Sequence, residues 1–178
     1  IGTGGFRLND YFTSHADLLA PAGEGFSAAL ATINEARTYV ASMCCAMVEA
    51  SLRTSVDYAS KRESFGRPII EHQGLSWQLA RVANQLEAAR ALTAKAIMVI
   101  EKEDSEAAIL PAAHAKKFAT EFVEPALTAC AQAMGANGLK EESLLGHRLT
   151  AARVANYVDG STEIMTDRIA KTLRNTYA

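Results

Sequence analysis

The apolar residues of this chain recur at helical spacing over three long stretches, and this pattern constrains the fold most. Residues 26–61 are rich in alanine and other helix formers, and their apolar side chains return every three or four positions. This first stripe consists of Ala41, Cys45, Val48, Leu52, Val56 and Ala59. Residues at this spacing share one face of an α-helix, so the segment predicts a long amphipathic helix with one buried face.

Two further stripes follow, separated by helix-ending residues. Gly66 and Pro68 end the first helix, and the next stripe contains Leu75, Leu79, Val82, Leu86, Ala89, Thr93, Ile97 and Ile100. At 1.5 Å per residue this second helix is roughly 40 Å long. The third stripe contains Val123, Leu127, Cys130 and Met134, and it ends at Gly135 and Gly138. Pro125 lies inside it, and because proline removes a backbone hydrogen bond at a cost of about 3 kcal/mol, we expect a kink or short break there.

The remaining segments predict short connections and two shorter helices. The charged residues 101–105 form a solvated turn, and the helices 142–157 and 161–174 are joined at Asp159 and Gly160. Long helices joined by short turns pack as antiparallel bundles, because each apolar stripe needs a partner. The predicted fold class is therefore all-α, an antiparallel four-helix-bundle-like domain of long helices with a short C-terminal helix.

Composition limits the classes of function. The net charge is −2, with acids and bases mixed along the chain, so there is no basic stripe for nucleic acid and no polybasic segment for anionic lipid. No uninterrupted apolar stretch approaches the length of a membrane span, and we interpret the chain as soluble. A length of 178 residues suffices for one hydrophobic core. Helical pattern begins near residue 24, which predicts a domain boundary there, and because the chain opens on Ile1 rather than methionine we expect a piece of a longer protein.

Cysteine and histidine residues give no sign of metal or acyl-enzyme chemistry. The three cysteines, Cys44, Cys45 and Cys130, lie in apolar helical patterns, which is typical of reduced core thiols in an intracellular protein. The histidines share no metal-ligand spacing, and no serine or cysteine occupies a nucleophile turn. We predict no metal site. In the second helix, Trp77 is predicted to pack.

Polar clusters fall at three turns, and each has two interpretations. Asp159 could be a general base, because a carboxylate on a turn is held by the flanking helices yet stays open to a substrate. The Asp-Gly-Ser-Thr sequence that begins there is also typical of a helix N-cap. Arg62 and Arg67 in the segment 61–68 could hold a phosphate or complement a helix dipole. The glycines of the segment 132–138 could admit a pyrophosphate close to the backbone or simply end a helix.

Taken together and in order, these clusters resemble the C-terminal helical domain of the acyl-CoA dehydrogenase flavoprotein family. The resemblance covers nearly the whole chain, and its strongest pieces are Arg62-Glu63-Ser64-Phe65-Gly66-Arg67-Pro68-Ile69 with Glu71-His72-Gln73, Gln132-Ala133-Met134-Gly135-Ala136-Asn137-Gly138, and Asp159-Gly160-Ser161-Thr162-Glu163-Ile164. In that family, FAD lies where an N-terminal helical domain, a middle β-domain and this bundle meet. The resemblance implies that residues 1–23 are the end of the middle β-domain with its linker, and that 24–178 form the C-terminal bundle for FAD binding and oligomerisation.

The resemblance also implies site residues. The cofactor FAD would contact Arg62, Ser64, His72, Gln73, Gln132, Gly135, Ser161 and Glu163, partly across a subunit interface. An arginine, amide groups and closely approaching glycine backbone suit a diphosphate. The acyl-CoA substrate would lie near Asn34, Arg37 and Gly160. From the pattern alone, Glu35 and Arg37 are surface residues.

Family members remove the α-proton of an acyl thioester while the β-hydrogen leaves as hydride to the flavin, which gives a trans-2-enoyl thioester. Their base is usually a glutamate followed by glycine, and Asp159 occupies that position one methylene shorter. Displacing a base by about 1 Å can cost on the order of a hundredfold in rate. Some members carry the base on the first long helix, where Ala36 stands here beside Glu35. A second departure is the pair 150–151, Thr-Ala where many members have Arg-Asp.

Three functions fit these features. The first is an acyl-CoA dehydrogenase in which Asp159 is the base, for a cyclic, branched or otherwise unusual acyl group. The second is a flavoenzyme similar to the nitroalkane oxidases, which use an aspartate base. The third is a non-catalytic subunit that supplies flavin contacts to a partner. The resemblance further implies electron-transfer flavoprotein or a similar acceptor, a homodimer or homotetramer, and a cytoplasmic location, or the mitochondrial matrix in a eukaryote. The isolated chain is expected to be inactive.

Overall fold

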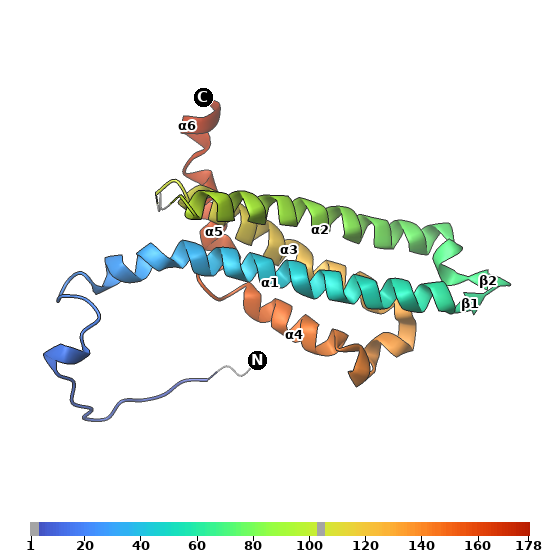
Figure 1. Ribbon diagram of the computed structural model, residues 1–178, viewed down its shortest axis with the longest axis horizontal. Helices are drawn as coiled ribbons and strands as arrows, with labels where there is room; N and C mark the ends of the chain where they lie inside the picture. The colour runs from blue at the N-terminus through green and yellow to red at the C-terminus, as the bar shows by residue number, and fades with distance from the viewer. Residues whose placement is uncertain (1–3, 103–105) are drawn as a thin grey trace.

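The computed structural model describes residues 4–102 and 106–178, and three long helices form its body (Figure 1). These helices are α1 (Gly25–Lys61), α2 (Gln73–Ile100) and α3 (Ile109–Met134). Each packs on the other two. The predicted all-α class is confirmed. Residues 103–105 of the predicted charged turn lie outside the described residues.

Shorter elements complete the chain. A two-stranded hairpin, β1 (Glu63–Ser64) with β2 (Arg67–Pro68), joins α1 to α2. After α3 come α4 (Leu145–Ala155), α5 (Thr162–Ala170) and α6 (Leu173–Tyr177). Short 3-10 turns cover His15–Asp17, Ile69–Glu71, Gly135–Leu139 and Glu141–Ser143. The predicted helix 142–157 is shorter than expected, because Leu144 adopts a left-handed conformation (φ 56°) that cannot continue a helix. The expected last helix is divided into α5 and α6.

The helices α1 and α3 run in the same direction. Near the end of both, the Ser55 hydroxyl donates to the Cys130 carbonyl at 3.0 Å. Near their start, Arg37 of α1 and Lys116 of α3 bond the same turn before α5. Because α2 lies between them in sequence and returns along the bundle, its direction is opposite (Figure 1).

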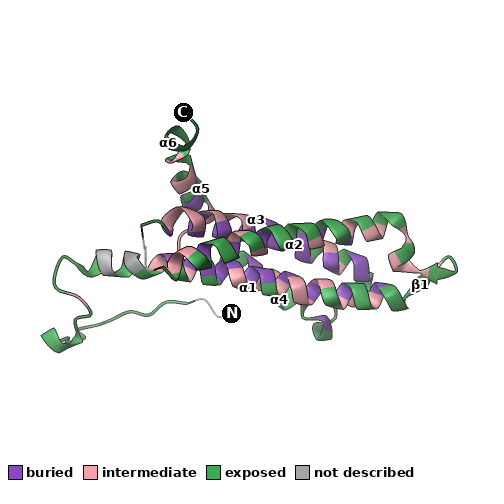
Figure 2. Ribbon diagram, turned by 45° about the horizontal axis from the view of Figure 1, so that its top comes forward, coloured by how far each residue is buried: buried purple, intermediate pink, exposed green. Residues whose placement is uncertain are grey.

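The predicted apolar stripes form the core, with two exceptions, Val56 in α1 and Ile97 near the end of α2. Purple, buried positions line the faces where the helices meet in Figure 2. The core includes Ala41, Cys45, Val48, Val82, Leu86, Val123, Leu127 and Cys130. Val56 was predicted to be buried and is 39% exposed. Ser51 and Ser55 are buried along with the predicted Ala59, since the helical repeat of 3.6 residues turns the contact face away from Val56 toward the end of α1.

Of the kink or short break predicted at Pro125, the structure contradicts the break, and the predicted packing of Trp77 is wrong. The helix α3 continues through Pro125 without a break. Pro125 is exposed, and so is Glu121, whose carbonyl loses its partner, so water can satisfy that group while Val123 and Leu127 remain fully buried. A bend of the helix axis there stays a prediction. Trp77 is 58% exposed rather than packed, because it lies off the buried stripe of α2.

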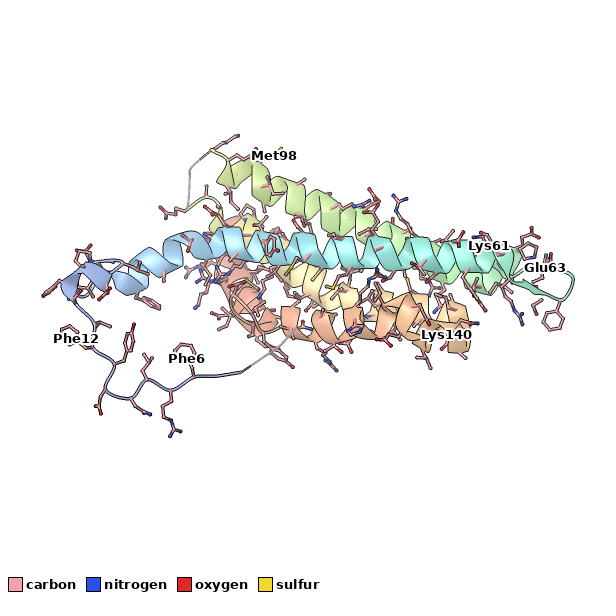
Figure 3. The ribbon with its side chains drawn as sticks, turned by 60° about the horizontal axis from the view of Figure 1, so that its bottom comes forward. Phe6, Phe12, Lys61, Glu63, Met98 and Lys140 are labelled. Carbon is pink, nitrogen blue, oxygen red and sulfur yellow. The ribbon has the colours of Figure 1, made fainter. Side chains whose placement is uncertain are left out.

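The segment before α1 leads away from the bundle (Figures 1 and 3). Between residues 4 and 24 it contains a 3-10 turn and no strand. A strand needs a neighbour for its backbone hydrogen bonds, and the described chain offers none beside it. Its apolar side chains, among them Phe6 and Phe12 in Figure 3, are exposed. Its assignment to the end of a β-domain stays a prediction.

None of the helices among the described residues combines the length and apolarity that crossing a bilayer requires.

Candidate active site at the Asp159 turn

Asp159 lies on the turn between α4 and α5 in a conformation that few residues adopt. Its φ is 55°, and that of Gly160 is 92°, so both lie in the left-handed region. Aspartate and glycine are among the few residues that tolerate this region. The N-cap of α5 is Ser161, whose Oγ accepts a hydrogen bond from the Ile164 N–H at 3.4 Å. Ser161 therefore supplies the cap, and capping does not account for the Asp159 carboxylate.

Buried cations hold the carbonyls of this turn. The Nε of Arg37 donates to the Asp159 carbonyl at 3.1 Å, and one terminal nitrogen donates to Oδ1 of Asn34 at 3.0 Å. The ammonium of Lys116 donates to the carbonyls of Val158 and Gly160. Three successive carbonyls, 158 to 160, thus accept hydrogen bonds from two cationic side chains.

Arg37 corrects the pattern-based prediction that it is a surface residue. It is 2% exposed, because these bonds satisfy its guanidinium inside the bundle. Asn34 is likewise buried, whereas Glu35 is exposed as predicted. The structure therefore brings three predicted substrate-site residues, Asn34, Arg37 and Gly160, together at the Asp159 turn.

Burial lowers the pKa of both cations, and the Asp159 carboxylate raises the pKa of both. Desolvation lowers the pKa of Arg37, the nearby Arg168 lowers it further, and the Asp159 carboxylate raises it. Desolvation likewise lowers the pKa of Lys116, with Asp159 and Cys44 raising it and Arg37 lowering it. The Asp159 carboxylate therefore lies close enough to both cations to raise their pKa values.

Gly160 is favoured by its left-handed conformation, and it is surrounded closely by side chains of α1 and α5. A Cβ on Gly160 would lie 3.3 Å from Cε of Met165 and 3.5 Å from a guanidinium nitrogen of Arg37. Ile164 Cγ2 would be 3.6 Å away. The turn therefore packs closely against both α1 and α5, and its backbone is fixed from several sides.

The predicted residues near the hairpin form a second cluster. Phe65 and Gly66, with φ of 51° and 77°, make the tight two-residue turn that suits a hairpin. The Nε2 of His72 donates to the Ser64 carbonyl at 3.0 Å, and its Nδ1 lies 3.3 Å from a guanidinium nitrogen of Arg67. The predicted residues Arg62 and Gln73 are exposed at the same end. This cluster presents two arginines at the surface, which suits a diphosphate.

Gln132 and Gly135 lie at the end of α3. Gly135 is exposed with φ of 57° and ends the helix, and Asn137 just beyond it donates to the Tyr58 hydroxyl at 3.0 Å. Packing explains why residue 138 is glycine, because a Cβ there would lie 2.7 Å from the Ala131 carbonyl oxygen.

An open groove of about 840 Å³ runs along α3 toward α5. Gln132 and Glu163 both line it, so the structure brings these two predicted cofactor residues onto one surface. The Ser161 hydroxyl lowers the pKa of Glu163, so this carboxylate is ionised at neutral pH. Glu121 and Glu124 also line the groove, and its arginine, Arg153, already pairs with Glu124 at 3.2 Å. The negative charge of these glutamates would repel a diphosphate. The exposed arginines of the hairpin suit a diphosphate better.

The Asp159 turn and the hairpin lie at opposite ends of the bundle. Arg37 lies in the first half of α1, and Arg62 follows the last residue of that helix. The two are 25 positions apart, which corresponds to about 38 Å along a helix. Figure 3 shows Lys61 and Glu63 at the hairpin end, far from Met98 at the other end. One chain therefore cannot bring both clusters to the same small molecule.

Sequence reasoning missed Lys116. It is fully buried and lies one helical turn before Thr120, whose hydroxyl is 3.1 Å from that of Thr162 at the start of α5. The signal was present, because Lys116 and Thr120 continue the apolar stripe of Val123 and Leu127 toward the start of α3. A lysine on a buried stripe needs partners, and the Asp159 turn supplies them.

Comparisons with known proteins agree with this geometry. Residues 23–174 match the family described as "Acyl-CoA dehydrogenase, C-terminal domain". An acyl-CoA dehydrogenase of Bacillus subtilis is 34% identical over 161 residues, covering 89% of this chain and 41% of that protein. A 3-sulfinopropanoyl-CoA desulfinase of Paraburkholderia xenovorans is 32% identical over 170 residues, covering 94% and 43%. The structure of butyryl-CoA dehydrogenase from Megasphaera elsdenii superposes with a TM-score of 0.79 at 28% identity, covering 85% and 39%.

Proposed function

The chain belongs to the acyl-CoA dehydrogenase family, whose C-terminal domain it contains, and from this premise we propose that it contributes Asp159 as the base of an FAD-dependent acyl-thioester dehydrogenase. The chain spans about two fifths of the length of the relatives it matches. The activity proposed is therefore that of the whole protein. The product is the trans-2-enoyl thioester, and acyl-CoA is the substrate class.

One observation carries this proposal. Asp159 is a half-buried carboxylate on a turn whose backbone is fixed by Arg37 and Lys116, while Ser161 caps the following helix. A general base must be held in place and left with its carboxylate available, and this turn meets both needs.

The residues present fit FAD as the cofactor. Bound FAD would supply the hydride acceptor at N5 for the β-hydrogen of the substrate. The exposed Arg62 and Arg67 would bind its diphosphate at the hairpin, beside the exposed backbone of Gly135. Ser161 and Glu163 would contact the flavin at the start of α5. Because the two clusters are about 38 Å apart along α1, a single FAD would take the hairpin from one subunit and the Asp159 turn from another. This argues for a homodimer or homotetramer.

The short side chain of Asp159 points to the shape of the substrate. A carboxylate one methylene closer to the backbone reaches less far, so the α-carbon must lie nearer to the turn. We propose a cyclic or branched acyl group that brings its α-carbon into this position.

Two alternatives rest on specific features. The aspartate itself equally suits a nitroalkane-oxidase-like flavoenzyme, which would abstract a proton without a thioester. The retained hairpin cluster suits a non-catalytic subunit that contacts a partner's FAD. One relative is named as a desulfinase rather than a dehydrogenase, so the reaction is argued from the Asp159 turn and not from likeness alone.

Anaerobic flavin bleaching in the whole protein tests these functions together. The full-length protein with FAD bound is mixed with a panel of straight, branched and cyclic acyl-CoAs and, separately, with nitroalkanes. The dehydrogenase function predicts bleaching by at least one acyl-CoA and none by nitroalkanes. Bleaching only by nitroalkanes would replace it with the second function, and a flavin that no substrate bleaches would favour the third.

The remaining proposals concern the setting of the enzyme. Electron-transfer flavoprotein or a similar acceptor would reoxidise the flavin, and the protein would work in the cytoplasm, or in the mitochondrial matrix of a eukaryote. We also propose that the 178-residue chain alone is inactive, because most of the flavin and acyl pocket would come from other domains. Turnover by the isolated chain would contradict this.

A further inference from the structure

A fully buried lysine behind the active-site turn takes no step in the proposed reaction itself. Lys116 lies on α3 with none of its surface exposed. Its ammonium donates to the carbonyls of Val158 and Gly160, the residues on either side of Asp159. Burying a lysine is costly unless hydrogen bonds compensate, so an aliphatic residue would fill this position more cheaply if packing were all it did.

We propose that Lys116 is a positioning residue for the Asp159 base, holding the left-handed turn so that the carboxylate keeps the direction needed to reach the substrate α-carbon. The inference rests on the proposed function. Lys116 lies behind the turn, bonded to its backbone, and it contacts neither the carboxylate oxygens nor any exposed surface. Its effect on the reaction is therefore indirect.

The turn needs such a clamp because its conformation is strained. A non-glycine residue with φ near 55°, as at Asp159, costs roughly 1–2 kcal/mol and persists only where its surroundings enforce it. Arg37 bonds only the middle carbonyl, that of Asp159, whereas Lys116 bonds both flanking carbonyls and so fixes the orientation of the two peptide units around the base.

The charge of Lys116 is as important for holding the turn as the length of its side chain. The groups that face it are Asp159 on the turn, Arg37 and Cys44 on α1, with Arg168 of α5 close to Arg37. A neutral side chain of similar length would remove two charge-assisted hydrogen bonds and leave the part-buried carbonyls of Val158 and Gly160 without these partners. The α3–α5 contact through Thr120 would remain, so the helix ends would stay in place while the turn loosened.

The first test measures the clamp without measuring activity. In the full-length protein with FAD bound, Lys116→Met replaces the stem of the side chain as far as Cε and removes the ammonium with its charge and donors. Hydrogen exchange in the peptide that covers 156–162 is expected to become roughly tenfold faster or more. The matched control is Lys117→Met, because Lys117 is the next residue on α3 and bonds the exposed Glu121 instead. This control is expected to leave the exchange of the turn unchanged.

The second test measures the consequence for the reaction. For an acyl-CoA that bleaches the wild-type flavin, the limiting rate of flavin reduction in Lys116→Met is expected to fall about 10- to 100-fold. The half-saturating acyl-CoA concentration should change less than about twofold, because Lys116 does not touch the substrate. A general loss of structure would instead weaken both binding and rate. If Lys116→Met does not fold, Lys116→Gln keeps one donor group and is expected to show intermediate effects.

Each outcome is decisive. Unchanged exchange in Lys116→Met would overturn the clamp, and faster exchange with a normal reduction rate would overturn its role in the reaction. Normal flavin reduction in Asp159→Asn would instead overturn the proposed base. The hydrogen-exchange result for Lys116→Met would still decide whether Lys116 holds the turn.

Discussion

Replacing Gly160 with alanine tests whether the Asp159 turn is held as tightly as its contacts indicate. Gly160 has a φ of 92°, and an L-residue in the left-handed region costs about 1–2 kcal/mol. The added Cβ would lie 3.3 Å from the flexible end of Met165, which can move aside for a few tenths of a kcal/mol, and 3.5 Å from the buried guanidinium of Arg37. Together these effects predict a loss of about 2 kcal/mol. For a chain of this size, this lowers the melting temperature by roughly 4–8 °C.

A matched glycine gives the opposite sign. Gly146 lies in α4, and a Cβ there would meet nothing within 4 Å. Gly146→Ala is expected to stabilise the chain by about 0.5–1 kcal/mol, because alanine loses less backbone freedom in a helix. Urea unfolding followed by circular dichroism measures both variants. A Gly160→Ala variant as stable as the wild type would refute the close packing of the turn.

Three further changes have defined outcomes. Ser55→Ala should cost about 1 kcal/mol in urea unfolding, because the Ser55 hydroxyl donates to the Cys130 carbonyl inside the core; Ser60→Ala, on the exposed face of the same helix, should change stability by less than about 0.5 kcal/mol. Burial raises the pKa of the Cys44 thiol from 9.0 to about 12, so its contribution to stability is complete below pH 9 and is lost as the pH rises toward 12. Unfolding near pH 8 and near pH 10.5 should show a fall about 2 kcal/mol larger for wild type than for Cys44→Ala, and equal falls would contradict this burial. Asp159→Glu should slow flavin reduction by up to about a hundredfold if the substrate is placed for the shorter acid, and a faster variant would remove the argument for an unusual acyl shape.

Apolar periodicity was sufficient to predict the bundle. The stripes of α1, α2 and α3 each contain many positions, so a single deviation such as Val56 does not change the fold. The break expected at Pro125 is absent, because the prediction considered the proline alone and not the packing of the residues around it. Packing of the neighbouring turns outweighs one lost hydrogen bond when the freed carbonyl is exposed to water.

The residues of the candidate site could be predicted from the sequence, but their arrangement in space could not. The polar turn indicated Asp159, the family resemblance implied Asn34 and Arg37, and the structure brings these three to one turn. The burial of Arg37 and the clamp by Lys116 depend on contacts across more than 40 residues of sequence, which no local pattern encodes. The separation of the hairpin from the Asp159 turn likewise follows from α1 being one continuous helix.

The central claim is that the Asp159 carboxylate removes the substrate α-proton, and single-turnover flavin reduction in Asp159→Asn tests it most directly. The full-length protein with FAD bound is mixed anaerobically with an acyl-CoA that bleaches the wild-type flavin, and the decay of flavin absorbance is followed in both proteins. Asparagine keeps the shape of the side chain and cannot accept the proton, so we predict that reduction slows by at least about a hundredfold while the flavin stays bound. Reduction at the wild-type rate would contradict the claim and assign the base to another residue.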